Sequence, residues 1–285
     1  MKRAALILAM LASTGLLAHA QYTAYDLGGG AAYGINDAGT AVGVSGAGHA
    51  FSYSGGVMTD LGPGMAKGIN NAGTIVGMNS ANDAFSYSGG SMTDLGPGMA
   101  NGINSAGTII GDSYTDPVAG HAFSYSGGSM TDLGVGVANG INSAGTIVGM
   151  SPIPGSYDDA FSYSGGVMTD LGTLPGGIDS MANGINSAGT IIGWSDASGG
   201  SRHAFSYSSG VMTDLSPYLS SIGLTGASDA TAIDDNGDIV GWGTTAGGEE
   251  DAFLLAVPEP ATWALLVLGV AGLALSGLRR RQSPA

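Results

Sequence analysis

Five Gly-Ile-Asn elements and one altered copy divide most of this 285-residue chain into repeated units. The elements begin at Gly34, Gly68, Gly102, Gly140 and Gly184, and the altered copy begins at Ala232. A small unit of this kind cannot bury its hydrophobic face alone. The sequence therefore predicts an array in which each unit stacks on its neighbours.

Each unit contains four short apolar or alternating runs separated by Gly and Asn, a pattern typical of β-strands joined by tight turns. One set of runs is Val57–Leu61, Met65–Asn70, Thr74–Gly77 and Ala84–Ser88. Four strands in six units predict an all-β domain, a six-bladed β-propeller. An open β-solenoid is the alternative, although it leaves strand edges unpaired.

The two ends of the repeat region complement each other. Tyr25–Gly28 matches only the Thr-Asp-Leu-Gly strand of a unit, and the last unit ends at Leu255 without that strand. We therefore expect the N-terminal strand to pair with the last strand and close the propeller.

The Phe-Ser-Tyr runs have one large and one small face. Because successive side chains of a strand alternate, Phe85 and Tyr87 share one face, whereas Ala84, Ser86 and Ser88 share the other. We expect each aromatic face to pack against the small face of the next unit.

Residues 1–20 have the pattern of a secretory signal peptide. The apolar run Ala4–Leu17 follows a basic start, and Ala18 and Ala20 form an A-x-A cleavage site. We expect signal peptidase to cut after Ala20, leaving a repeat domain over residues 21–256. An uncleaved anchor is the alternative, but the apolar run is short for a spanning helix.

Residues 257–285 form a second membrane-directed segment. The apolar stretch 261–278 is long enough for one transmembrane helix, and the positive-inside rule keeps the arginines after it in the cytoplasm. The motif before the helix and the basic cluster after it are Pro258, Glu259 and Pro260, then Arg279, Arg280 and Arg281.

This order of motif, helix and basic cluster resembles the PEP-CTERM sorting signal of Gram-negative bacteria. The resemblance implies recognition by an exosortase, which cuts near the Pro-Glu-Pro site and places the body at the cell surface or in the extracellular matrix. A plain C-terminal membrane anchor is the alternative.

Composition limits the partners. The chain has no cysteine, which excludes disulfides and thiol chemistry. Residues 21–256 contain Lys67 and Arg202 against 21 acidic residues, a formal charge of 2 − 21 = −19. Nucleic acid is excluded as a partner because binding phosphates requires many Lys and Arg side chains. Divalent cations and neutral glycans, including exopolysaccharide, remain as ligands.

Three units carry a His-Ala-Phe sequence, beginning at His49, His121 and His203. These repeats resemble the HAF family of extracellular repeats, which implies an extracellular repeat protein without a defined activity. The other three units have Asp at the same position, so a metal-binding ring of His and Asp is an alternative to a simple polar strand start. The Asp positions are Asp83, Asp159 and Asp251.

Loop lengths vary at only two points of the repeat, and in a meander both points lie at the same end of the sheets. We expect this end to be the ligand face, since insertions in arrays usually decorate one side. Its aromatic residues can bind glycan or merely anchor the loops. They are Tyr114, Tyr157, Trp194, Tyr218 and Trp242.

No residue pattern predicts catalysis. Asp234, Asn236 and Asp238 resemble part of a calcium loop, but they stand where other units have a plain turn, so we expect no cofactor. The Asp of each Thr-Asp-Leu-Gly repeats too regularly for a catalytic group. We therefore expect a non-enzymatic binding or structural module; the alternative is a glycan-active enzyme using loop carboxylates such as Asp158 and Asp159.

Overall fold

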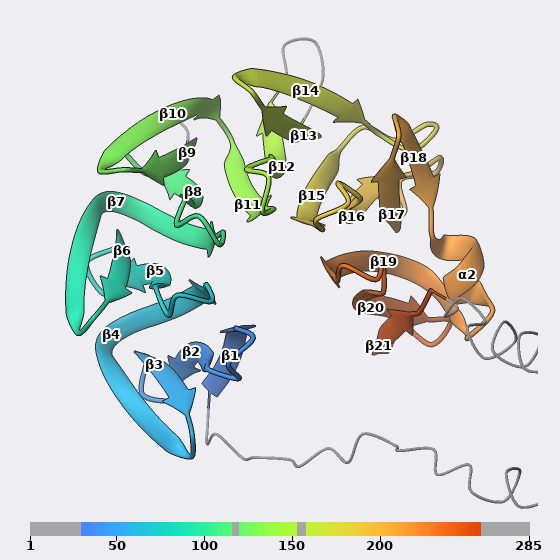
Figure 1. Ribbon diagram of the computed structural model, residues 1–285. Coiled ribbons are helices and arrows are strands. Elements are labelled where there is room, and N and C mark those ends of the chain that lie inside the picture. The colour runs from blue at the N-terminus through green and yellow to red at the C-terminus, as the bar shows by residue number, and fades with distance from the viewer. Residues whose placement is uncertain (1–29, 116–119, 153–157, 258–285) are drawn as a thin grey trace, which may run out of the picture.

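The computed structural model describes residues 30–115, 120–152 and 158–257. Within these ranges the chain is all-β, with 21 strands and one five-residue helix. The strands form six antiparallel units that follow one another along an arc, with the first strand of each unit nearest its centre (Figure 1).

The units are simple meanders, numbered here 1 to 6 in chain order. Unit 1 contains β1 (Gly30–Ile35), β2 (Ala41–Ser45), β3 (His49–Ser54) and the first half of β4 (Val57–Ile69). Unit 2 contains the second half of β4, β5 (Ile75–Asn79), β6 (Asp83–Ser88) and the first half of β7 (Ser91–Ile103). Unit 3 contains the second half of β7, β8 (Ile109–Ser113), β9 (His121–Ser126) and β10 (Ser129–Val135).

The remaining units have separate strands. Unit 4 contains β11 (Val137–Ile141), β12 (Ile147–Pro152), β13 (Asp158–Ser164) and β14 (Val167–Gly172). Unit 5 contains β15 (Ser180–Ile185), β16 (Ile191–Asp196), β17 (Arg202–Ser208) and β18 (Val211–Asp214). After helix α2 (Ser216–Ser220), unit 6 contains β19 (Leu224–Ile233), β20 (Ile239–Thr245) and β21 (Glu250–Leu255).

The last strand of one unit can continue directly into the first strand of the next. The Val57–Leu61 run forms the last strand of its unit, and it continues without a turn into the first strand of the next unit as β4. The same continuity makes β7 a 13-residue strand that pairs with both β6 and β8. Consequently, each unit begins at the Gly-Ile-Asn strand and ends at the Thr-Asp-Leu-Gly strand.

The Asn of each Gly-Ile-Asn element builds a tight turn. In unit 2 the backbone N–H of Asn70 donates to the carbonyl of Thr74 at 3.1 Å. The side-chain oxygen of Asn70 accepts the backbone N–H of Thr74 at 3.0 Å. Gly73 has φ +80°, a conformation that favours glycine. This explains why the Asn-x-x-Gly-Thr sequence recurs.

The core lies between units, as the alternating strands predict. Phe123 and Ile109 of unit 3 pack against Val76 and Ala84 of unit 2, and all four are at most 3% exposed. Equivalent clusters fill the other four interfaces between consecutive units. The expected direction was wrong: each aromatic face contacts the small face of the preceding unit, as Phe123 of unit 3 contacts Ala84 of unit 2.

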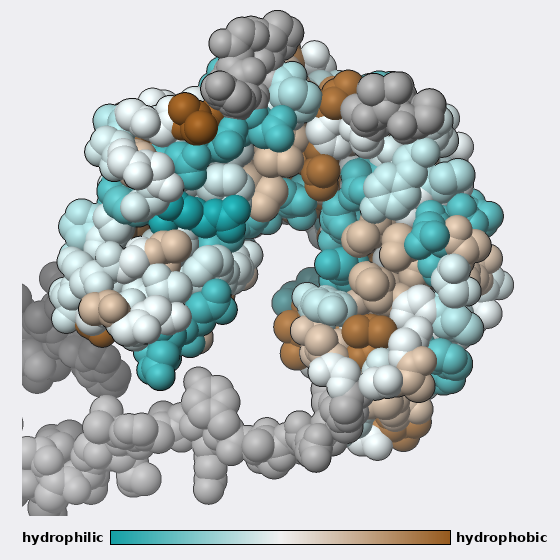
Figure 2. Space-filling model, turned by 180° about the vertical axis from the view of Figure 1, so that it is seen from behind, coloured by the Kyte–Doolittle hydropathy of each residue, from teal (hydrophilic) through white to brown (hydrophobic). Residues whose placement is uncertain are grey.

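The described residues form an open arc, with a gap between units 1 and 6 (Figures 1 and 2). Within the described ranges unit 6 has three strands. Val240 on its far face is 42% exposed, although its counterparts in the other units are fully buried. The predicted closing strand, Tyr25–Gly28, lies outside the described residues.

No helix within the described ranges is long and apolar enough to cross a membrane. The predicted signal peptide, residues 1–20, and the predicted span, residues 261–278, both lie outside those ranges.

Candidate functional site

Both kinds of variable loop lie at one end of the sheets, as predicted. The backbone N–H of Ser80, in the β5–β6 loop, donates to the carbonyl of Pro63 at the crossing between units 1 and 2, at 3.1 Å. In the next unit Tyr114 donates to Pro97 in the same way, also at 3.1 Å. We call this end, formed by the second-to-third-strand loops and the crossings between units, the variable-loop face.

Two of the predicted aromatic residues are exposed. Tyr114 follows β8 and is 45% exposed, and Tyr218 lies in α2 and is 60% exposed. Partial burial, with the neighbouring Asp112 carboxylate, raises the pKa of Tyr114 to about 12. Its hydroxyl therefore stays a neutral hydrogen-bonding group at any physiological pH.

The two tryptophans lie in strands rather than in loops, contrary to the prediction. Trp194 belongs to β16 and is only 9% exposed, because the Arg202 guanidinium stacks over its ring at 3.7 Å. Its ring nitrogen is buried without a hydrogen-bond partner among the described residues. Trp242 is a half-buried residue of β20. Trp194 therefore anchors the strand and is no ligand platform. Tyr157 lies outside the described residues.

A charged cluster beside Trp194 was not anticipated. The Asp229 carboxylate accepts a 2.7 Å hydrogen bond from the Asn183 side chain and lies 3.6 Å from the Arg202 guanidinium. Burial of Asp229 raises its pKa to about 6, and Arg202 and Asn183 only partly oppose this. The one sequence signal for this cluster was that Arg202 is one of two strong bases in residues 21–256.

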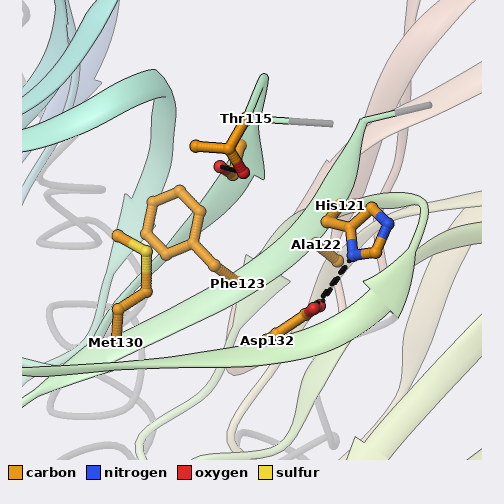
Figure 3. A pocket seen from close by; sticks show the side chains of 7 residues that line it. Thr115, His121, Ala122, Phe123, Met130 and Asp132 are labelled. Atoms are coloured by element: carbon orange, nitrogen blue, oxygen red, sulfur yellow. Dashed lines mark hydrogen bonds and ion pairs between the residues drawn. The ribbon is translucent and has the colours of Figure 1, made fainter. Parts of the chain in front are cut away.

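The three His residues of the His-Ala-Phe sequences do not converge on an axis. Each pairs with the Thr-Asp-Leu-Gly aspartate of its own unit: His49 with Asp60 at 2.9 Å, His121 with Asp132 at 3.0 Å, and His203 with Asp214 at 2.9 Å. Figure 3 shows the His121–Asp132 pair beside Phe123, at a cavity of about 360 Å³. Each of these His–Asp contacts lies within one unit, which favours a polar strand start over a shared metal ring.

The repeated aspartates have the structural role that was expected. The Asp60 carboxylate accepts the backbone N–H of Gly62 at 2.8 Å, and this bond, together with the His49 contact, lowers the pKa of Asp60. The equivalent bonds end at Asp94, Asp132, Asp170 and Asp214. Each one fixes the backbone at the point where the chain leaves its unit.

The Asp234–Asp238 segment forms the same turn as its counterparts. The Asp234 carboxylate accepts the N–H groups of Asp238 at 2.8 Å and Asn236 at 2.9 Å, and these bonds lower its pKa. Within the described ranges no three His, Asp or Glu side chains are grouped as metal ligands.

The carboxylates proposed for the enzymatic alternative are poorly placed. Asp158 and Asp159 are neighbours in β13, so they point to opposite faces of the strand. Asp158 is exposed and Asp159 is 3% exposed, so the two do not flank one site.

The domain ends at the opposite end from the variable-loop face. The backbone N–H of Val257 donates to the Asp238 carboxylate at 2.7 Å. Asp238 belongs to the turn between the first and second strands of unit 6, a turn of constant length that we call the constant turn of each unit. Only two residues separate the end of β21 at Leu255 from Pro258. Several predicted residues follow or precede the described ranges: Ala18, Ala20, Pro258, Glu259, Pro260, Arg279, Arg280 and Arg281.

Residues 256–281 match the family of the PEP-CTERM protein-sorting motif. The chain carries this sorting motif. It implies an exported protein that an exosortase sorts, anchored in the membrane first and then cleaved for the cell surface. No curated protein sequence is significantly similar to the chain. The resemblance to HAF repeats stays a prediction.

Proposed function

We propose that the chain is an exosortase-sorted surface or extracellular-matrix protein whose repeat domain is a non-enzymatic binding or structural module. The sorting motif at residues 256–281 carries this proposal, because it makes the exterior the destination of everything that precedes it. The fold we propose for the body is a six-bladed β-propeller. Its support is the arc of six units with five equivalent apolar interfaces.

The variable-loop face is the proposed ligand surface. The sorting tail leaves from the constant turns, where Val257 is bonded to Asp238, so the variable loops point away from the membrane before the tail is cut. Tyr114 is an exposed aromatic group at this face. The partner we propose is a neutral exopolysaccharide, since the formal charge of −19 on residues 21–256 repels acidic polymers.

Removing the sorting tail tests the destination. Deletion of Val257–Ala285 is expected to move the body from the cell surface to the surrounding fluid or the periplasm, as measured by fractionation and immunoblotting. An intact chain with Ser201→Ala serves as the control. An unchanged distribution after the deletion contradicts the sorting proposal.

A polysaccharide panel tests the activity. We expect purified body to bind one or more neutral polysaccharides without releasing reducing ends, and Tyr114→Ala to weaken that binding at least tenfold. Release of reducing ends that is lost on substituting Asp or Glu residues of the variable-loop face contradicts the non-enzymatic assignment and favours the glycan-active enzyme.

A further inference from the structure

A groove runs along the outer side of unit 6. In units 1 to 5 a fourth strand covers the third strand, but β21 has no neighbour on that side among the described residues. The groove has a volume of about 360 Å³ and is predominantly apolar. It is lined by Leu215, Tyr218, Leu254, Leu255 and Val257, among others. Leu254 is 59% exposed there.

At the start of unit 1 the backbone has the same conformation as at the points where the chain passes from one unit to the next. Gly30 has φ +136°, and Gly64, Gly98 and Gly136 have φ +137°, +148° and +139° at the crossings into units 2, 3 and 4. A Cβ atom on Gly30 would lie 2.1 Å from the carbonyl oxygen of Val44, and the later glycines face the same kind of carbonyl at 2.3 Å. The backbone at Gly30 therefore matches a chain that arrives from the outer strand of another unit.

The residues before Gly30 have the spacing of such an outer strand. Asp60 precedes Gly64 by four residues, and Asp26 precedes Gly30 by the same four. A segment that ends so close to unit 1 reaches the outer strand position of unit 6 only when units 6 and 1 are neighbours. The short connection therefore requires unit 6 to lie beside unit 1, and within one chain this arrangement is a ring.

A paired substitution supports this register. In all five complete units a Ser of the third strand faces a Thr of the fourth, as Ser52 faces Thr59. In unit 6 the Ser position is Leu254, and the matching position of the N-terminal segment is Tyr25. A polar pair has been replaced on both strands by an apolar and an aromatic residue, which stabilise each other as cross-strand neighbours.

We propose that the groove beside β21 is the docking site of Thr23–Gly28, with Tyr25 opposite Leu254 and Asp26 opposite Phe253. This rests on the proposed propeller fold and names the surface that closes it. Because Thr23 is the third residue after the predicted cleavage site at Ala20, the closing strand is the start of the mature protein. The two processed ends of the chain then lie beside each other on unit 6.

Engineered cysteines test the docking directly, since the natural chain has none. Facing residues of antiparallel strands have Cα atoms about 4.5–5.5 Å apart, within the range of a disulfide. We would introduce Tyr25→Cys with Leu254→Cys into the full-length secreted protein and oxidise it. Ser52→Cys with Thr59→Cys is the matched positive control, and Tyr25→Cys with Ser162→Cys, at the equivalent position of unit 4, is the negative control.

We expect the Tyr25–Leu254 pair to form an intramolecular disulfide with a yield within about twofold of the Ser52–Thr59 control. Absence of that disulfide while the control forms overturns the proposal. Disulfide-linked dimers also overturn it, because they place the strand of a second copy in the groove. Neither result bears on sorting or glycan binding, which are measured separately.

Amide hydrogen exchange on the unmodified protein avoids any effect of substitution on folding. We expect the amides of β21 to be protected as well as those of β17, whose fourth strand β18 is present. Exchange in β21 at least tenfold faster than in β17 would contradict a docked strand.

Discussion

The side-chain amide of Asn104 donates a 3.2 Å hydrogen bond to the backbone carbonyl of Asn142, the equivalent residue of the next unit. The same bond joins every consecutive pair of units. It runs from Asn36, Asn70, Asn104, Asn142 and Asn186 to the residue that follows in this series, ending at the carbonyl of Asp234. The Asn of the repeat thus both builds its own turn and holds the next unit.

Removing the side-chain donor of one of these bonds between units should lower the stability of the domain. Asn104→Asp keeps an acceptor for the N–H of Thr108 but cannot donate to Asn142, so we expect the free energy of unfolding to fall by about 1–3 kcal/mol. Ser105→Asp adds the same charge to an exposed position of the same turn and is expected to cost less than about 0.5 kcal/mol. Equal effects of the two variants in denaturant melts would show that charge, not the bond, is responsible.

The bond series stops at unit 6 because Asp234 has no N–H donor on its side chain. In a closed ring the backbone carbonyl of Asn36 in unit 1 lies next to residue 234 of unit 6. Asp234→Asn then supplies a side-chain donor for that carbonyl. We expect Asp234→Asn to raise stability by about 1 kcal/mol more in the intact chain than in a chain lacking residues 22–28. Identical effects in the two backgrounds would contradict contact between units 6 and 1.

A recurring Gly in the second strand of each unit should tolerate no side chain. A Cβ on Gly149 would lie 1.9 Å from the carbonyl oxygen of Val137 and 3.0 Å from the Phe161 ring. We expect Gly149→Ala to destabilise the domain by about 3 kcal/mol or more, measured by thermal unfolding. At Gly120 the nearest atom to a Cβ is 3.8 Å away, so Gly120→Ala should change stability by less than about 0.5 kcal/mol.

Asp229 should make stability depend on pH near neutrality. Its pKa of about 6 lies above the 3.8 of an unburied aspartate, so the folded protein binds the proton more tightly than the unfolded chain. The stabilising contribution of protonation is complete below about pH 4 and is lost as the pH rises through 6. We therefore expect Asp229→Asn to be more stable relative to the natural protein at pH 7.5 than at pH 4.5.

The control for this pH dependence is Glu249→Gln, at an exposed carboxylate. Its stability should run parallel to that of the natural protein over the same range. If Asp229→Asn also runs parallel, the burial of Asp229 does not control the titration.

Much of the fold follows from the repeat itself. The alternation of Phe85 and Tyr87 with small residues predicted faces that pack between units, and the loop lengths predicted one variable face. The way one unit passes to the next could not be predicted, because Gly62-Pro63-Gly64 has the composition of a turn and does not distinguish a hairpin from a crossing between units. The continuous strand β4 settles that point.

The candidate site was less predictable than the fold. Trp194 was assigned to a loop because its segment varies in length, yet cross-strand pairing with Met181 extends β16 through it. The Asp229 cluster joins residues 46 positions apart in the chain, from Asn183 to Asp229. Such contacts depend on how units 5 and 6 stack, which no local pattern encodes.

The intact mass of the native protein, measured after fractionation of its host, shows whether the chain is exported and cut at both ends. We expect a chain that begins at Gln21, ends near Pro258–Pro260, and is found outside the cytoplasmic membrane. A chain that retains residues 261–285 and stays in the cytoplasmic membrane would contradict it.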